Sequence, residues 1–477
     1  MGAGSGERRR AIDVSCGDIL GMQCRRGGED VKGEGKKMGR YAITTAVLLA
    51  AAGWATIASA QAPTSEGIAG QIIQSIPVAP AQPIVPLNVD DQTAKPPRAI
   101  ADIEGLKVEI KSFRFTNLTL VSENEVQAVV APYLGPNRRF QDLLDAAAAA
   151  KKVLVQRGYF LADVIVPEQK IADGIIELLV LEGRLGKIKV EIAEDVTVSE
   201  SAIRDMVSGL EEGDVIRTST LERALFLISD LKGITLRSVI EPGEKLGTAN
   251  LTLKIAAARK FEGNVDFDVN GSLYNGVFRL SAGIDINNPT GRGDFLNLRT
   301  TTSDLGFLRG SWGGDEFLRL TDNQGGLLKY TRVSYLTPIG SWGTKLGASL
   351  SALEYRLGTE TFLPIKADGW AFVQSLMGVH PFIRSRNTNV LGVVQWDARK
   401  FHDAKGATNT VTETESSVTS ITLNGDFRDM IFGGGINVYS LSSTRGELDF
   451  LTSGDRAADA LGRKTQGVYE KSNFTYS

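Results

Sequence analysis

The sequence predicts an α+β repeat followed by an all-β antiparallel sheet of the kind that forms transmembrane barrels, and three observations support this fold class. The first is a pair of two-faced runs in residues 261–288, where Phe261, Val265 and Phe267 alternate with acidic and amide residues. Side chains alternate in this way along an extended strand. The second is an order of strand, helix, helix, strand and strand that occurs twice between residues 105 and 257. The third is a series of similar two-faced runs that reaches the C-terminus.

The runs in residues 261–288 have the length of membrane-crossing strands. Each has about ten residues, whereas strands of soluble proteins average about five or six and a tilted membrane strand needs about 9–11. We therefore interpret the apolar face as lipid-facing and the polar face as the lining of an aqueous lumen. The candidate pore-lining residues are Asp266, Asp268, Arg279, Arg384 and Arg386. For Arg384 and Arg386, the alternative is a pair of solvated residues at a turn.

Composition limits the class of protein. The chain has 477 residues and a formal net charge of −3, so it is long enough for two or three domains and gives no indication of a nucleic-acid partner. A mean hydropathy of −0.06 excludes a polytopic helical membrane protein. It is compatible with a barrel, because only alternate residues of a barrel strand face lipid.

The N-terminal region reads as a secretory leader. Residues 1–37 are interpreted as an upstream extension before a start at Met38, and residues 38–60 as a signal peptide with a small-residue cleavage site at Ala58-Ser59-Ala60. The alternative is a membrane anchor, for which the apolar run is short. Cys16 and Cys24 both precede the cleavage site, so the mature chain has neither a disulfide framework nor a thiolate metal site. We predict no cofactor and no metal.

Residues 61–104 are predicted to be a short helix and a tether. Ile68, Ile72 and Ile76 are four residues apart, a spacing that places them on one helical face. Prolines then recur up to about residue 100, so we expect an extended linker without helix or sheet.

Two α+β modules are predicted next, over residues 105–184 and 185–257, followed by a partial barrel over residues 258–477. In the first module we expect strands at 107–115, 160–166 and 174–180 and helices at 122–133 and 140–156. In the second we expect strands at 187–192, 235–241 and 249–255 and helices at 199–208 and 218–231. In the barrel region about ten strands are predicted, and residues 402–415 are predicted to form a long polar surface loop.

Several motifs resemble those of one family. They are Arg157-Gly158-Tyr159-Phe160, Val166-Pro167-Glu168-Gln169, Asp173-Gly174, Leu181-Glu182-Gly183-Arg184, Asn288-Pro289-Thr290-Gly291-Arg292-Gly293-Asp294, Pro381-Phe382-Ile383-Arg384-Ser385-Arg386-Asn387 and Thr444-Arg445-Gly446-Glu447-Leu448-Asp449. On these motifs the chain resembles the two-partner secretion transporters, the TpsB group that includes haemolysin secretion/activation proteins. The resemblance implies two periplasmic POTRA domains and a sixteen-stranded barrel in the bacterial outer membrane. It also implies export, and activation, of one large secreted β-helical partner of the adhesin or haemolysin type, with the segment around residues 68–76 as a pore plug.

The C-terminus departs from that pattern. The family motif Val-Arg-Gly-Tyr is absent, and the sequence reaches Ser477 after about ten strands. We therefore expect a C-terminally truncated transporter. The alternatives are an assembly factor of the BamA type, a non-functional fragment, and a soluble periplasmic scaffold. The sequence contains neither a phosphate-binding loop nor a nucleophile elbow, so an enzyme is not predicted and export is expected to need no ATP.

Modules of this kind are expected to bind an unfolded partner by strand addition, in which an edge strand pairs with an extended peptide. The alternative is that the aliphatic residues of the flanking helices only fill each module's own core. The candidate partner-binding residues are Phe160, Leu161, Ala162, Asp163 and Val164 in the first module and Leu236, Arg237, Ser238 and Val239 in the second.

Overall fold

The computed structural model describes residues 69, 89–91, 107–171, 173–305 and 326–477. The predicted upstream extension, the predicted signal peptide and most of the predicted helix and tether lie outside these residues. Within the described ranges, no helix combines the length and the apolar character needed to cross a membrane.

Two α+β modules follow one another with the same strand connections. The first consists of β2 (Lys107–Ile110), β3 (Ser112–Thr116), α3 (Glu123–Val130), η1 (Ala131–Tyr133), β4 (Gly135–Arg139), α4 (Phe140–Gln156), β5 (Asp163–Ile165) and β6 (Ile175–Leu181). The second consists of β7 (Arg184–Ile192), α5 (Glu200–Met206), α6 (Thr218–Ser229), β8 (Ile234–Pro242) and β9 (Thr248–Ala257). In each module the last strand, β6 or β9, lies between a parallel strand, β3 or β7, and an antiparallel strand, β5 or β8. The predicted internal repeat is confirmed.

Each module has its own core, because its helices bury one face against its sheet. Helix α4 buries Leu143, Val153 and Leu154, at the spacing of one helical stripe. Helix α6 likewise buries Leu221, Leu225 and Ile228 against the second sheet. For these residues, the interpretation as core filling is confirmed.

Two predicted strands of the first module are wrong in extent. The strand expected at 107–115 is interrupted at Lys111 and forms β2 and β3. The strand expected at 160–166 is reduced to β5, because the chain makes a turn after α4 in which the Ala162 amide donates to the Tyr159 carbonyl at 3.0 Å. Phe160 and Leu161 precede β5 and pack against the core of the second module.

The tether contains a strand that was not predicted. Strand β1 (Val89–Asp91) pairs in parallel with β8, with Asp90 opposite Val239. The expectation that no sheet forms before residue 100 is therefore wrong at this point. Residues 87–95 contain no proline, so their backbone amides are free to pair, and β8 offers the edge of a sheet.

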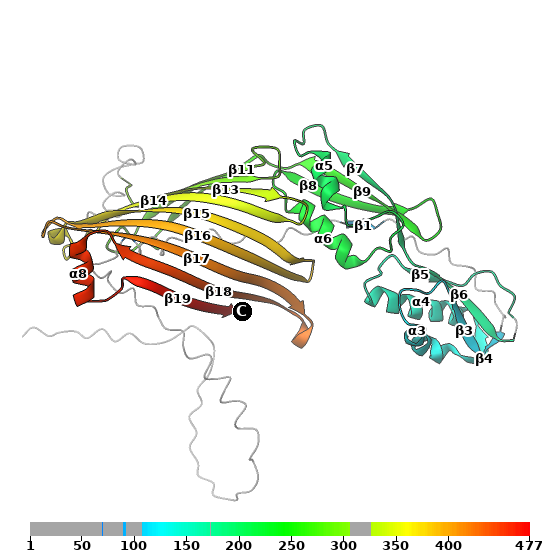
Figure 1. Cartoon of the computed structure of the whole chain (residues 1–477). Helices are drawn as coiled ribbons and strands as arrows, with labels where there is room; N and C mark the ends of the chain where they lie inside the picture. The colour runs from blue at the N-terminus through cyan, green and yellow to red at the C-terminus, as the bar shows by residue number, and fades with distance from the viewer. Residues whose placement is uncertain (1–68, 70–88, 92–106, 172, 306–325) are drawn as a thin grey trace, which may run out of the picture. The chain divides into compact units, whose positions relative to one another are not determined.

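The third region is a ten-stranded antiparallel sheet whose strands lie side by side in chain order (Figure 1). The predicted number of about ten strands is confirmed. The strands are β10 (Phe261–Asp268), β11 (Arg279–Asn287), β12 (Phe295–Thr302), β13 (Leu327–Ile339), β14 (Thr344–Arg356), β15 (Ala367–Arg384), β16 (Thr388–Lys405), β17 (Thr410–Asp429), β18 (Gly435–Phe450) and β19 (Gly467–Tyr476). Helix α8 (Ser453–Leu461) links the last two.

The strands from β15 to β17 are long, with 18, 18 and 20 residues. The polar loop expected at residues 402–415 is wrong, because β16 and β17 continue through it and leave only residues 406–409 between them. Two pairs of side chains connect the strands there, with Lys400 at 2.6 Å from Glu415 and His402 at 3.1 Å from Glu413. Cross-strand side-chain pairs stabilise a sheet.

Candidate functional site

The large sheet has an inverted distribution of polarity. In β14, Leu346 and Leu350 are 48% and 53% exposed, whereas Ser349 and Ser351 are only 4% and 8% exposed. The same alternation continues in neighbouring strands, where Leu376 and Ile421 are exposed. We call the side of Ser349 and Ser351 the polar face and the other side the apolar face. Such an arrangement is favourable only if the apolar face meets lipid.

The polar face brings together charged residues from many strands. Members assigned by strand register are Asp266, Asp268, Arg279, Asp285, Arg299, Arg332, Arg384, Asn389, Asp397, Arg399, Asp403 and Asp426. Arg279 pairs with Asp268 at 3.0 Å, and Arg299 pairs with Asp285 at 3.3 Å. Of the predicted pore-lining residues, Asp266, Asp268, Arg279 and Arg384 lie on this face.

Arg386 lies elsewhere. It is in the β15–β16 turn, is 56% exposed, and is 3.8 Å from Glu222 of α6. The alternative interpretation as a turn residue therefore holds for Arg386. Sequence reasoning missed Asp285 and Arg299, although both have the alternating spacing of the residues that it selected.

One end of the sheet contacts the second module through three turns, and we call it the docked end. The first of these turns, residues 288–294, carries two contacts. Asn288 Nδ2 donates to Thr197 Oγ1 at 2.8 Å, and the Lys232 amide donates to the Gly293 carbonyl at 3.1 Å. The motif identified in the sequence at this position is thus a docking turn.

Asp294 holds the docking turn in shape. It is fully buried, accepts a hydrogen bond from the Tyr335 hydroxyl at 2.7 Å, and accepts one from the Thr290 amide at 3.2 Å. Burial acts to raise the pKa of this carboxyl, but the hydrogen bonds from Tyr335, Thr290 and the backbone outweigh it and lower the pKa below its usual value. Asp294 is therefore a carboxylate at neutral pH.

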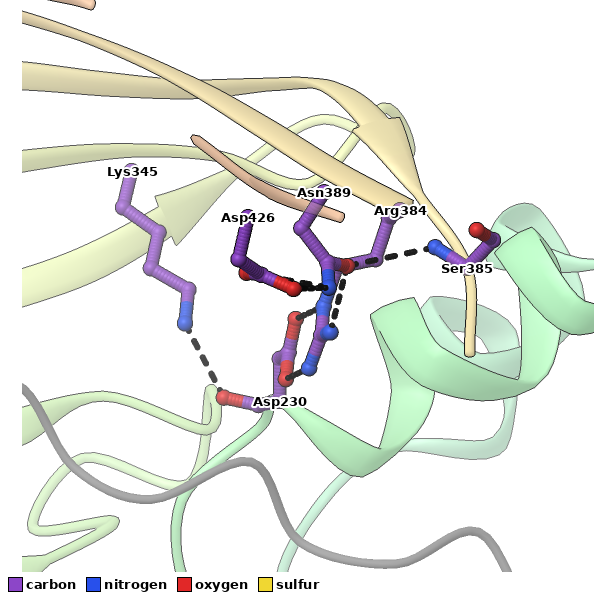
Figure 2. Close-up of polar contacts among 6 residues, drawn as sticks. All are labelled: Asp230, Lys345, Arg384, Ser385, Asn389 and Asp426. Atoms are coloured by element: carbon purple, nitrogen blue, oxygen red, sulfur yellow. Dashed lines mark hydrogen bonds and ion pairs between the residues drawn. The ribbon is translucent and has the colours of Figure 1, made fainter. Parts of the chain in front are cut away.

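The C-terminal end of α6 is held by two cations of the sheet (Figure 2). Arg384 makes a bidentate pair with Asp230, with Nε–Oδ2 and Nη2–Oδ1 distances of 2.9 and 2.8 Å. Lys345 Nζ donates to the Asp230 carbonyl at 3.0 Å. The Arg384 guanidinium also lies 4.6 Å from the centre of the Phe226 ring. Cations at a helix C-terminus are favourable, because the last carbonyls carry partial negative charge.

Arg384 also belongs to the hydrogen-bond network of the polar face. Its Nη1 donates to Asn389 Oδ1 at 2.9 Å, and Asn389 Nδ2 donates to both carboxylate oxygens of Asp426 at 3.2 and 3.0 Å (Figure 2). The Ser385 amide donates to the same Asn389 oxygen at 3.2 Å. The network therefore links the second module to β15, β16 and β17.

Arg223 joins the side of α6 to the last residues of β15 and to the turn between β13 and β14. Its Nη1 donates to the carbonyls of Pro381 and Phe382 at 3.1 and 3.2 Å, and its Nη2 donates to that of Trp342 at 3.4 Å. Sequence reasoning selected none of Arg223, Asp230 and Lys345, because their partners are more than one hundred residues away along the chain.

The predicted partner-binding residues lie in two environments. Ala162 and Val164 are 1% and 6% exposed, whereas the Asp163 side chain is 46% exposed and pairs with Lys151 at 3.1 Å. In the second module Ser238 is fully buried and Arg237 is exposed, and the edge of β8 is paired with β1. The structure thus places a segment of the chain itself on one of the two predicted binding edges.

At the other end of the polar face, Asp403 contacts the predicted N-terminal plug region. Asp403 Oδ1 accepts hydrogen bonds from the Ala69 amide, at 3.1 Å, and from the Tyr355 hydroxyl. Ala69 is fully buried against Leu328 and Leu353. A residue of the predicted plug segment therefore lies on the polar face.

These features define a class. Two α+β modules joined to an antiparallel sheet with an apolar exterior and a polar interior are the architecture of outer-membrane transport barrels with periplasmic POTRA domains. Residues 108–183 match the POTRA domain family of the ShlB type. The chain is homologous to the two-partner secretion transporters HuxB and CdiB, and the resemblance noted from its motifs is confirmed.

The relatives match as follows. Heme/hemopexin transporter protein HuxB of Haemophilus influenzae is 26% identical over 365 residues, which cover 76% of this chain and 60% of HuxB. Outer membrane transporter CdiB of Escherichia coli is 25% identical over 198 residues, or 42% of this chain and 33% of CdiB. The solved structure of CdiB from Escherichia coli has a TM-score of 0.52 at 20% identity, covering 73% of this chain and 61% of that chain, and shows the same fold.

The chain spans about 60% of the length of the HuxB relatives that it matches. It is an outer-membrane protein, with its POTRA domains in the periplasm and its sheet in the membrane. The docked end of the sheet is accordingly its periplasmic end.

Proposed function

We propose that the chain exports a secreted protein across the outer membrane, by passing it in extended form along the polar face of the barrel. The observation that carries this proposal is the inverted polarity of the ten-stranded sheet, joined at its periplasmic end to two POTRA domains. The relatives support it, since HuxB and CdiB are both named as transporters. The partner would be a large secreted β-helical protein of the adhesin or haemolysin type, which the transporter also activates.

The membrane part of this proposal can be tested with single cysteines in β14. Leu350 lies on the apolar face and Ser351 beside it on the polar face, and the natural cysteines, Cys16 and Cys24, both precede the predicted cleavage site. In intact outer membranes we expect a bulky water-soluble thiol reagent to label Ser351→Cys and to spare Leu350→Cys. Equal labelling of the two variants would exclude a lipid-facing apolar side.

Capture of the partner would use the free edge of β5. This strand pairs with β6 on one side and has no partner on the other among the described strands. Recognition would rest on the backbone amides and carbonyls of residues 163–165, since an edge strand offers these groups whatever its side chains are. Backbone recognition fits a partner that enters unfolded and whose sequence varies along its length.

The edge of β8 would become a second capture site only after β1 has left it. The pairing of β1 covers three residues, from Val89 opposite Ser238 to Asp91 opposite Ile240. A longer extended segment of the partner would form more backbone hydrogen bonds along the nine residues of β8 and could displace β1. Strand β1 thus competes with the partner for the same edge.

Ala69 would lie in the lumen in the resting state. The bond from the Ala69 amide to Asp403 and the burial of Ala69 against Leu353 support this plug. The partner would have to displace the segment during passage. Replacement of Asp403 by asparagine would leave a weaker acceptor and is expected to increase ion conductance through the barrel in planar lipid bilayers.

Export would need no nucleotide, because folding of the partner outside the cell supplies the direction of movement. The test is reconstitution of the protein in liposomes with an unfolded secreted β-helical protein on one side. We expect transfer without ATP. A transfer rate that rises with added ATP would contradict this mechanism, and no transfer under either condition would contradict the export function itself.

A further inference from the structure

Helix α6 takes hydrogen-bond partners for both of its ends from other parts of the chain. At its N-terminus, the amide and the hydroxyl of Thr218 both donate to the Gly158 carbonyl of the first POTRA domain, each at 2.9 Å. No side chain in the described part of the chain caps this end. The first amides of a helix have no partner within it, so Gly158 satisfies an otherwise free donor. At the C-terminus, Lys345 and Arg384 of the sheet hold Asp230.

The contact at the N-terminal end is made by the Arg157-Gly158-Tyr159-Phe160 motif. Gly158 follows helix α4 with a φ of +90°, a conformation that glycine adopts without strain, and this turns its carbonyl toward α6. Arg217 Nη2 donates to the Tyr159 hydroxyl at 2.9 Å, and its guanidinium lies 5.4 Å from the centre of the Tyr159 ring. The motif therefore joins α4 of the first domain to α6 of the second.

Between its two ends, α6 is a rigid element. It has 12 residues and is roughly 18 Å long, at about 1.5 Å per residue. Its buried side chains are Leu221, Ala224, Leu225, Phe226, Leu227 and Ile228. A helix with an apolar stripe packed into a core moves as one body, because bending it would open voids along the stripe.

We propose that α6 is a strut that couples the first POTRA domain to the periplasmic end of the barrel. A displacement of Gly158 must either carry the N-terminus of α6 with it or break the bonds to Thr218 and Arg217. If α6 follows, its C-terminus moves against Arg384 and Lys345. The role of the strut rests on the proposed function. Strand β5 packs against α4, so capture of the partner at β5 would displace α4 and weaken the contact of the second domain with the barrel.

Two backbone amides report on the barrel end of the strut. The Arg386 amide donates to Glu222 Oε2 at 3.2 Å, and the Lys232 amide donates to the Gly293 carbonyl at 3.1 Å. Both bonds cross from the second domain to the turns of the sheet. Hydrogen exchange at these two amides therefore measures how often the contact opens, and exchange at the Thr218 amide measures the same for the other end.

The perturbation is Thr218→Val, which removes the hydroxyl donor and keeps the shape of the side chain. Its control is Thr220→Val, because Thr220 lies in the same helix turn and is exposed. In the full chain in lipid nanodiscs, without any partner, we expect Thr218→Val to accelerate exchange at Arg386 and Lys232 by about fivefold, the lower end of usual coupling factors. Thr220→Val should leave both amides unchanged.

Faster exchange at Thr218 with unchanged exchange at Arg386 and Lys232 would overturn the coupling. If Thr218→Val also accelerates exchange of the core amides of β9, the test is repeated with Arg217→Gln. Arg217 is exposed and contacts Tyr159, and Arg204→Gln on α5 is its control. Here too, exchange that rises at Arg386 supports the strut, and exchange that does not rise excludes it.

The same coupling can also be measured from the barrel end of α6. Because coupling between two sites acts in both directions, Asp230→Asn at the barrel end must also accelerate exchange at the Thr218 amide. No partner protein takes part in these measurements. A failure would therefore remove the strut and leave the export proposal standing, whereas a failure of export in liposomes would leave the strut unaffected.

Discussion

The ion pair between Arg384 and Asp230 is expected to contribute about 2 kcal/mol to the docking of the second POTRA domain on the barrel. Both side chains are less than one-third exposed, at 13% and 30%. The pair is bidentate, and hydrogen bonds to charged groups contribute about 1.5–3 kcal/mol each after the cost of desolvation. We take the lower part of this range, because other hydrogen bonds remain when the pair is broken. The Asp230 carbonyl still accepts from Lys345, and Arg384 still donates to Asn389.

A double-mutant cycle measures this coupling. Asp230→Asn and Arg384→Gln are each expected to lower the docking free energy, and the double variant should be little worse than either single variant. A coupling of about 2 kcal/mol corresponds to a factor of roughly 30 in the opening equilibrium. The assay is hydrogen exchange at the Arg386 amide, which donates to Glu222 across the junction. Arg384→Lys should recover little of the loss, because lysine cannot make the bidentate contact.

The matched control is Arg386→Gln, two residues further along the chain. The Arg386 side chain is 56% exposed and 3.8 Å from Glu222, so its pair should contribute about 0.5 kcal/mol or less, and less again at high salt. Strictly additive effects of Asp230→Asn and Arg384→Gln would refute the assignment of Arg384 as the main docking contact. An Arg386 coupling as large as that of Arg384 would refute the argument from burial.

Three further predictions concern the junction and the edge of β8. Gly343→Ala should weaken docking by more than Gly340→Ala. Both positions have positive φ, so the backbone strain is similar, but only a side chain at 343 would overlap Leu227 of α6. Hydrogen exchange at the Lys232 amide compares the two variants. Because the pKa of Asp294 is lowered, its contribution to the free energy of unfolding is complete above the ordinary value of 3.8 and is lost as pH falls through the lowered pKa. Asp294→Asn should therefore lower the free energy of unfolding by about 1–3 kcal/mol at pH 7. The melting temperature of this variant should depend little on pH near pH 3. Asp90→Pro should abolish the pairing of β1 and strengthen binding of an extended partner peptide to β8 by several-fold, measured by fluorescence anisotropy; unchanged affinity would show that β1 does not compete.

The ten strands could be predicted from sequence because their signal is local. Leu346, Leu350, Ser349 and Ser351 alternate within a few residues, and that period is the direct consequence of strand geometry. The same alternation identified Asp268 and Arg279, which face each other in the structure. The strand ends were less predictable, because pairing with a neighbour extends a strand through polar residues. Residues 402–415 are the clearest case, where cross-strand pairs hold two polar segments in the sheet.

The docking contacts could not be predicted, because nothing near Asp230 in the sequence indicates its partner. Asp230 and Arg384 are 154 positions apart, and a carboxylate after a helix is ordinarily a solvated residue. Strand β1 was missed for a related reason. Its three residues have no pattern of their own, and they are ordered as a strand by the free edge of β8. Both features depend on which surfaces the folded domains bring together.

The composition of the junction indicates where the protein opens first. The junction includes polar contacts from Arg223, Arg384 and the Lys232 amide. These can be exchanged for hydrogen bonds to water, at a net cost of about 1 kcal/mol for an ordinary hydrogen bond and about 2 kcal/mol for the Arg384 ion pair. The domain cores are aliphatic, and burial of one such side chain contributes about 1.5–3 kcal/mol that water cannot replace.

The second POTRA domain should therefore leave the barrel as a folded unit. In hydrogen exchange, the amides of β9 should be the most protected, and those of Arg386 and Lys232 should exchange faster while β9 stays closed. Equal protection of β9 and the junction would mean that the two open only together. The docking turns would then be part of the domain core, and a strut that transmits movement across them would have nothing to release.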